Sequence, residues 1–351
     1  MTTNVLAASD RAGNFAEFDV ALWQWGLFVA LIVALLLADL VLVRRDAHVI
    51  TFKEAAIESA VWISIGVAFT GVVFAWHGAQ PAGEYISAFL LEKSLSIDNV
   101  FVWAVIFNYF AVPAKYQFRT LFWGIFGALV LRAMFIFAGI ALIESFEFVL
   151  VIFGLVLLYS AWKIAFHDDQ EVHPDKNPVL RLVRRVLPST TTYDGQKLFT
   201  MENGKRLATP LFAVLIIVET TDVVFAVDSV PAVLAVSHEQ FIVFSSNAFA
   251  ILGLRSLYFL LGGMHDKFRY LNLGLGAILA FVGGKMLTGY FFGFHPPTWL
   301  SLVVIVVVLT VTIVASLLAD RRDDARVAVG DREPSAQSID PAGDDVDPPI
   351  P

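Results

Sequence analysis

The chain has 351 residues, of which 58% are hydrophobic, and its mean hydropathy of +0.72 lies well above the soluble average. This composition excludes an ordinary soluble domain and indicates a protein that crosses the membrane several times. The formal net charge of -8 gives no support to nucleic-acid binding, since acidic residues gather in the tail and within apolar segments. The sequence contains no cysteine, which excludes disulfides and thiolate ligation of soft metals.

Nine apolar stretches, of about 20 residues each, are long enough to cross a hydrocarbon core about 30 Å thick as helices. They lie near residues 22–43, 55–77, 84–110, 119–142, 145–166, 209–236, 240–262, 271–292 and 298–318. The stretches are continuous rather than alternating in polarity, which disfavours a β-barrel. We therefore predict an all-α polytopic membrane protein with about nine transmembrane helices. No basic n-region precedes the first stretch, so we expect it to be retained rather than cleaved as a signal peptide.

Basic residues are distributed unevenly between the connections. If the N-terminus is outside, Arg11 is the only Lys or Arg in an outer segment, and the inner segments carry the others that lie outside spans. This pattern predicts an N-out, C-in orientation. The predicted parts are an extracytoplasmic N-terminus (1–20), a first membrane half with five spans (21–166), a cytoplasmic linker (167–208), a second half with four spans (209–318) and a disordered cytoplasmic tail (319–351).

Two acidic stretches are related to each other and indicate an internal duplication. The equivalent residues are Glu92 and Asp222, Asp98 and Asp228, Arg132 and Arg255, and Lys163 and Lys285. Equivalent spans are three apart, an odd number, so the two units must cross the membrane in opposite directions. We therefore predict an inverted repeat of three helices, formed by spans 3–5 and 6–8. Transporters with this architecture bind their substrate near the bilayer midplane, where the two units meet.

Charged side chains within the spans indicate what such a site would bind. A charge at the bilayer centre costs roughly 2.5–3.5 kcal/mol, so each needs a partner, water or a bound ion. The embedded carboxylates, Asp39, Glu92, Asp98, Glu219, Asp222 and Asp228, outnumber the central cations, Lys93, Arg132 and Arg255. Either some of the acids are protonated or a cation is bound, and hard oxygen ligands suit Mg²⁺, Ca²⁺ or Mn²⁺. No nucleophile with an adjacent base or phosphate-binding loop is visible, so we do not expect an enzyme or a permanently bound cofactor.

We predict that seven polar residues form a midplane metal site and that four charged residues act as structural or gating partners. The predicted metal ligands are Glu92, Asp98, Asn99, Glu219, Asp222, Asp228 and Ser229, and the predicted charge partners are Lys93, Arg132, Arg255 and Asp39. Glu219 and Asp228 lie on opposite sides of an ideal helix. Because Pro231 lacks an N–H group, we expect the helix to bend or unwind near Asp228 and to free the Val227 carbonyl as a further ligand.

At these residues the chain resembles the TerC family of integral membrane proteins, which is named for tellurium resistance and includes manganese exporters of the Alx type. The resemblance covers roughly residues 20–318 and rests on the runs 91–99, 219–222 and 225–231, together with Arg132 and the run 252–258. It implies export of a divalent metal, most often Mn²⁺, with Ca²⁺ as the alternative ion. It also implies a link to tellurite resistance in some members, and in some relatives a supply of metal to proteins that emerge from the secretion machinery.

Two other functions are compatible with the same residues. A membrane scaffold or assembly factor would use the intramembrane charges only to hold helices together, because pairing is the usual fate of such charges. A tellurite-resistance protein that moves the oxyanion directly would need an excess of positive charge, whereas the embedded residues carry an excess of negative charge. The charge count therefore favours a cation.

Overall fold

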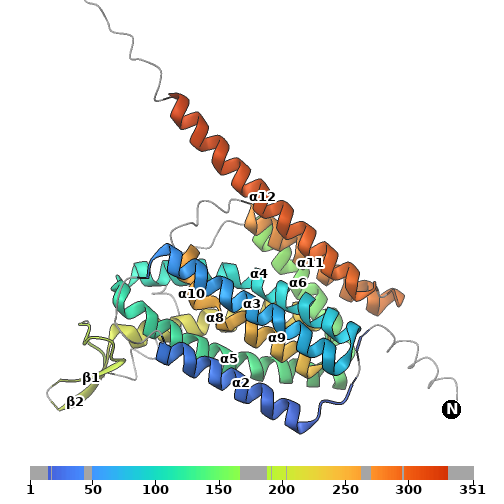
Figure 1. Cartoon of the computed structure of the whole chain (residues 1–351), viewed down its shortest axis with the longest axis horizontal. Coiled ribbons are helices and arrows are strands. Elements are labelled where there is room, and N and C mark those ends of the chain that lie inside the picture. The colour runs from blue at the N-terminus through green and yellow to red at the C-terminus, as the bar shows by residue number, and fades with distance from the viewer. Residues whose placement is uncertain are drawn as a thin grey trace, which may run out of the picture.

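The computed structural model describes residues 15–16, 18–42, 50–166, 188–190, 192–202, 204–261, 270–294 and 296–330 (Figure 1). Its helices are α2 (Leu22–Leu42), α3 (Phe52–His77), α4 (Ala79–Tyr109), α5 (Ala114–Ser145), α6 (Val149–Phe166), α8 (Pro210–Leu234), α9 (Gln240–Leu252), α10 (Leu254–Leu261), α11 (Leu271–Phe292) and α12 (Thr298–Gly330). Seven of them are long and apolar enough to span a membrane, and α9 and α10 together could form one broken span. The all-α polytopic class is confirmed. The count of nine spans, the inverted repeat and the orientation stay predictions.

Helix α4 lies at the centre of the bundle and carries four charged residues. It has 31 residues, which correspond to a length of about 46 Å. It is not among the helices apolar enough to count as spans by composition, and it carries Glu84, Glu92, Lys93 and Asp98. The helix packs against α3, α8, α9, α10 and α12. This enclosure is what allows its charged residues to lie at membrane depth, because they face protein rather than lipid.

The outer helices present apolar side chains that no other part of the described chain covers. Helices α2 and α12 lie at opposite edges of the bundle in Figure 1, and most of each apolar stretch is not buried within the protein. The side chains of Leu22, Trp23, Val307 and Val311 are more than half exposed. Such a surface suits contact with lipid tails, so the bundle has the form expected of a protein embedded in a bilayer.

Helices α6 and α11 pack closely through small residues. A Cβ atom added at Gly283 would lie 2.9 Å from the Gly154 carbonyl oxygen, and one added at Gly154 would lie 3.3 Å from the Gly283 carbonyl oxygen. Glycine is therefore required at both positions for the two backbones to approach this closely. Small residues commonly bring transmembrane helices together in this way.

The helix was expected to bend or unwind near Asp228, and the predicted unwinding is wrong. Helix α8 runs without interruption from Pro210 to Leu234, with Pro231 inside it and buried. The ring removes one N–H donor, but every further backbone bond lost in a membrane also costs free energy, so unwinding the helix would be worse than leaving one bond unmade. The intact helix keeps Asp228 on a different face from Asp222.

A break occurs instead at Gly253, where α9 and α10 meet at an angle of 41°. The carbonyl oxygen of Ala250, in the last turn of α9, accepts a hydrogen bond of 3.1 Å from Lys93 Nζ. A Cβ atom at Gly253 would lie 2.8 Å from Trp62 Cβ and 2.9 Å from Lys93 Nζ. The ammonium group therefore binds a carbonyl next to the bend, and the absence of a side chain at Gly253 leaves it the space to do so.

A two-stranded antiparallel sheet lies in the segment before α8. Strand β1 (Phe199–Glu202) pairs with β2 (Lys205–Ala208), and Phe199 lies opposite Ala208. The sheet belongs to the predicted cytoplasmic linker, whose residues 167–187 lie outside the described residues, as do residues 1–14 and the tail from 331 onward. The predicted disorder of the tail is thus not tested, and the boundaries of the parts stay predictions.

Candidate functional site

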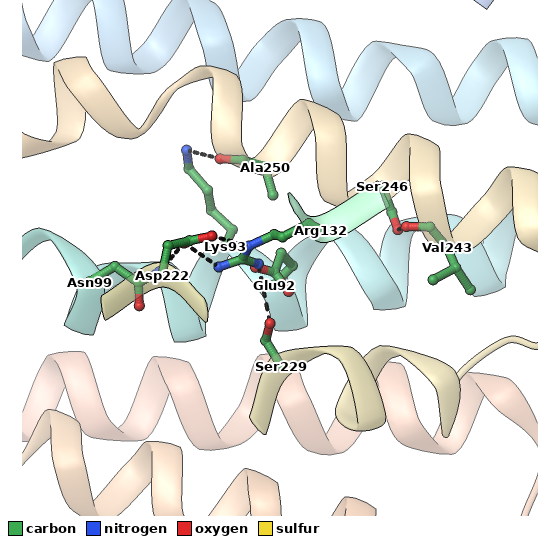
Figure 2. Close-up of polar contacts among 9 residues, drawn as sticks. All are labelled: Glu92, Lys93, Asn99, Arg132, Asp222, Ser229, Val243, Ser246 and Ala250. Atoms are coloured by element: carbon green, nitrogen blue, oxygen red, sulfur yellow. Dashed lines mark hydrogen bonds and ion pairs between the residues drawn. The ribbon is translucent and has the colours of Figure 1, made fainter. Parts of the chain in front are cut away.

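The guanidinium group of Arg132 joins two helices at the centre of the bundle (Figure 2). Arg132 lies on α5, and its side chain is 1% exposed. Its Nε and Nη2 atoms donate to the two carboxylate oxygens of Asp222 on α8, at 3.2 and 3.1 Å. Its Nη1 atom donates to Glu92 on α4 and, at 3.2 Å, to Ser229 Oγ on α8. One buried cation therefore binds two buried carboxylates, one of them in the bidentate geometry that arginine favours.

The polar residues around Arg132 come from equivalent positions of the predicted repeat. Asn99 follows Glu92 by seven residues on α4, and Ser229 follows Asp222 by seven residues on α8. Seven residues make about two helical turns, so each pair lies on one helix face. Asn99 Nδ2 lies 3.5 Å from Asp222 Oδ1. The structure thus brings Glu92, Asn99, Asp222 and Ser229 together.

A small cavity lies beside this cluster, with a volume of about 20 Å³. Its polar lining comes from Asp98, Asn99, Arg132, Asp228 and Ser229, and its apolar lining from Leu95, Ile164, Phe225, Leu275 and Leu279. A volume of this size accommodates about one water molecule, and an ion that had lost its hydration shell would need no more space. The two carboxylates equivalent in the repeat, Asp98 and Asp228, therefore border the same cavity.

Asp228 is held by a residue that the sequence reading did not single out. Ser160 Oγ on α6 donates a hydrogen bond of 2.6 Å to Asp228 Oδ1, and the Lys163 ammonium interacts with the same carboxylate electrostatically. Ser160 is 6% exposed. Ser160 could have been singled out from the sequence, because it is a polar residue within the apolar stretch of α6, one turn before Lys163.

Glu219 is the predicted ligand that the structure does not join to the cluster. Its Oε2 atom is buried without a hydrogen-bond partner among the described residues. Its carboxylate lies against Gly127 of α5, where an added Cβ atom would collide with it. Glu219 precedes Asp222 by one helical turn on α8, so it lies between the cluster and the start of that helix.

The remaining predicted charge partners lie outside the cluster. Arg255 on α10 binds both carboxylate oxygens of Asp39 on α2 at 2.6 Å and lies 3.6 Å from Glu58 Oε2 on α3. Its guanidinium also stacks over the Phe118 ring, 4.2 Å from the ring centroid. The structure therefore pairs Arg255 with Asp39, two of the predicted charge partners whose pairing the sequence did not assign, and adds Glu58, which the sequence reading missed. Lys93 points away from its neighbour Glu92 and binds Ala250 (Figure 2).

Among the described residues, no three His, Cys, Asp or Glu side chains are arranged to hold a metal ion. Arg132 explains this, because its guanidinium lies between the carboxylates of Glu92 and Asp222. The cluster still contains more carboxylates than cations, since Asp98 and Asp228 border the adjoining cavity. A cation that entered the cavity would lie beside Asp98 and Asp228, and it would have to share Glu92 and Asp222 with Arg132 or displace Arg132.

Three comparisons relate the chain to known proteins. A family model described as "Integral membrane protein TerC family" matches residues 77–324. An "Uncharacterized membrane protein STKORF319" of Myxococcus xanthus is 46% identical over 297 residues, which cover 85% of this chain and 92% of that protein. A protein of Escherichia coli K12 named "Putative membrane-bound redox modulator Alx" is 43% identical over 311 residues, or 86% of this chain and 96% of that protein. No solved structure matches.

Proposed function

Because the chain belongs to the TerC family of integral membrane proteins, we propose that it exports a divalent cation, Mn²⁺ or alternatively Ca²⁺, across the bacterial inner membrane. The observation that supports this proposal is the convergence of carboxylates from two helices on one buried guanidinium and one adjoining cavity. Intramembrane acids are costly and commonly mark ion pathways. Oxygen ligands in excess of positive charge suit a hard cation.

In this proposal Arg132 takes the place of the transported ion when no ion is bound. Its guanidinium neutralises Glu92 and Asp222 within the protein, which avoids the cost of leaving two carboxylates unpaired at membrane depth. An entering divalent cation competes for the same carboxylates and repels the guanidinium. Asp98, Asn99, Asp228 and Ser229, which border the cavity, supply further oxygen atoms. Glu219, one turn nearer the predicted cytoplasmic end of α8, is the first acid that the ion meets.

The test is cation flux by purified protein in vesicles, measured with a panel of divalent ions at two pH values. We expect saturable Mn²⁺ flux that falls at least tenfold in both Asp98→Asn and Asp228→Asn. Glu144→Gln serves as the matched control, because Glu144 is an exposed carboxylate at the end of α5 and away from the cavity. Normal flux in a variant that carries both Asp98→Asn and Asp228→Asn would refute the assignment.

A second candidate function follows from the same Arg132 contacts. If the salt bridges serve only to fasten α4 and α8 to α5, the protein is a membrane scaffold or assembly factor, and vesicles would show no metal flux that depends on these acids. Direct transport of tellurite would instead give oxyanion flux that is indifferent to Mn²⁺.

The E. coli relative is named a redox modulator. Since this sequence has no cysteine, such a role here would not involve its own thiol–disulfide exchange.

A further inference from the structure

A second buried carboxylate, Glu84, lies on α4 toward the end that we predict to be extracytoplasmic. Glu84 is fully buried. Its Oε1 atom accepts a hydrogen bond of 2.7 Å from the Ala16 N–H, and its Oε2 atom accepts one of 2.7 Å from Ser237 Oγ. Gln80 Nε2 lies 3.5 Å from Oε1. Glu84 therefore connects three parts of the chain: α4, the connection after α8, and the segment before α2.

The segment before α2, residues 15–16 and 18–21, is here called the N-terminal strap. It runs across one end of the bundle in Figure 1. The Phe15 ring stacks on His238 with ring centroids 4.3 Å apart, and the Phe18 ring stacks on His77 at 3.9 Å. Two aromatic pairs and the Glu84 carboxylate thus hold the strap over the ends of α3, α4 and α9.

The contact between Glu84 and Ser237 repeats the spacing of the central cluster. Glu84 precedes Glu92 by eight residues on α4, and Ser237 follows Ser229 by eight residues along α8 and its connection. Eight helical residues span about 12 Å. Glu92 and Ser229 both bind Arg132 Nη1. The chain segments of α4 and α8 are therefore joined at two levels, once at the centre and once about 12 Å further out.

Between these levels the structure is packed without polar gaps. Every residue from 230 to 236 is buried, and Ala88 and Leu91 of α4 are fully buried beside them. These residues belong to one apolar cluster with Ile136 and Ile140 of α5. An ion that left the central cavity outward along α4 and α8 would have to cross this layer and then the Glu84 contacts.

We propose that Glu84, Ser237 and the N-terminal strap form the extracytoplasmic gate of the ion pathway, closed in this structure. The inference rests on the proposed transport function. The strap is attached to Glu84 by the Ala16 N–H and to His238 and His77 by ring stacking, so it can be released without breaking a helix, whereas α4 is continuous through this region and α8 is continuous up to Leu234. Opening requires the Ala16 and Ser237 bonds to break together, because both end on the same carboxylate.

The first test measures access to the layer beneath the strap. Since the chain has no cysteine, Ala88→Cys gives a single thiol one helical turn inward from Glu84. A membrane-impermeant maleimide added outside should label it slowly, and adding Glu84→Ala should raise the labelling rate about tenfold, equivalent to about 1.4 kcal/mol in the opening equilibrium. Glu144→Gln, an exposed acid in another predicted outer connection, should leave the rate unchanged. Equal rates with and without Glu84 would overturn the gate.

The second test closes the strap covalently in a protein that retains Glu84. Phe15→Cys with His238→Cys places two thiols where the rings now stack. Oxidation should form a disulfide and reduce Mn²⁺ efflux at least tenfold, and a reductant should restore it. Because the effect is reversible, loss of folding cannot account for it. Unchanged efflux after complete cross-linking would overturn the gate.

The two proposals fail in different ways. If Ala88→Cys labelling depends on Glu84 but the unmodified protein moves no Mn²⁺, the transport function is refuted and the strap remains a closure of the outer end. If the unmodified protein moves Mn²⁺ but neither labelling nor cross-linking has an effect, the gate is refuted and transport stands.

Discussion

Arg132 and Arg255 occupy equivalent positions in the predicted repeat, yet they bind acids from different parts of the chain. Arg132 binds Glu92 and Asp222, which lie within the two repeat units and whose side chains are 0% and 1% exposed. Arg255 binds Asp39 and Glu58 on α2 and α3, outside the units, and the side chains of these acids are 9% and 27% exposed. The arginine of the first half therefore lies at the centre of the bundle, and the arginine of the second half lies at its periphery.

The difference shows how an intramembrane charge can serve either a site or a scaffold. The cavity beside Arg132 is lined by two further acids, Asp98 and Asp228, so a second cation can approach this part of the molecule. The Arg255 acids instead attach α2 and α3 to α10, with the Phe118 ring covering the guanidinium. We expect substitutions around Arg132 to alter both stability and ion flux, and those around Arg255 to alter stability alone. Four predictions test or refine this comparison.

The largest effect is expected for Arg132→Leu. It leaves two fully buried carboxylates without their cation, and breaking a buried pair in this way typically costs about 3–5 kcal/mol. Thermal unfolding in detergent measures the loss. Neutralising the acids in the same chain, with Glu92→Gln and Asp222→Asn, should recover much of the stability but not the ion flux. If the triple variant is no more stable than Arg132→Leu, the salt bridges do not carry the stability assigned to them.

Arg255→Leu should destabilise the protein less, by about 1.5–3 kcal/mol, the usual range for hydrogen bonds to charged groups. Part of the cost is relieved because Glu58 is partly accessible to solvent. We expect Mn²⁺ flux per folded molecule to stay within twofold of the unmodified protein. A loss of flux as large as that of Asp98→Asn, at normal protein stability, would show that the peripheral pair also takes part in transport.

Gly127→Ala tests the acid that lies apart from both arginines. The new methyl group must displace the Glu219 carboxylate, and since this is the flexible end of a side chain we expect a cost of about 1 kcal/mol, at the low end for overpacking. Gly284→Ala is the matched control, because nothing lies within 4 Å of its added Cβ atom. Unfolding curves of the two variants that superimpose would contradict the close contact between α5 and Glu219.

The smallest effect on stability is expected for Asp194, whose side chain is partly exposed to water. The Thr200 hydroxyl and then Lys197 hold the pKa of Asp194 below its usual value of 3.8. A depressed pKa means that the ionised carboxylate stabilises the β1–β2 segment above the unfolded pKa and that this contribution is lost as the pH falls through the folded pKa. The protection factors of the amides in residues 199–208, in which the intrinsic pH dependence of hydrogen exchange is divided out, should therefore be lower at pH 3 than at pH 6. Asp194→Asn should remove this pH dependence.

The positions of the helices could be predicted from the sequence because a membrane span needs a continuous apolar run of fixed length. That Arg255 needs an acidic partner could also be predicted, but the sequence did not show that the partner is Asp39. The contacts of Ser160 and Glu84 could not be predicted. A single polar side chain in an apolar run shows that a partner is needed but not which of several helices supplies it.

Two backbone features show where local rules fail in a membrane. Pro231 would end most helices in water, but in α8 the neighbouring helices enclose it and the helix continues. Gly253 marks a break that is accompanied by a contact from Lys93, which is 160 residues earlier in the chain and binds the carbonyl of Ala250 across the helix interface. Such a break is a property of two helices packed together, so no reading of α9 alone would find it.

The composition of α4 has a consequence for how the protein is made. This helix is not among those that qualify as spans by composition, and three of its polar contacts are supplied by chain that the ribosome synthesises later: Arg132, Asp222 and Ser237. A nascent chain that ends after α6 lacks the last two. Stable integration of α4 into lipid should therefore await α8, and a glycosylation-mapping series of truncated chains would show α4 entering the bilayer fully only once residues beyond 237 have emerged.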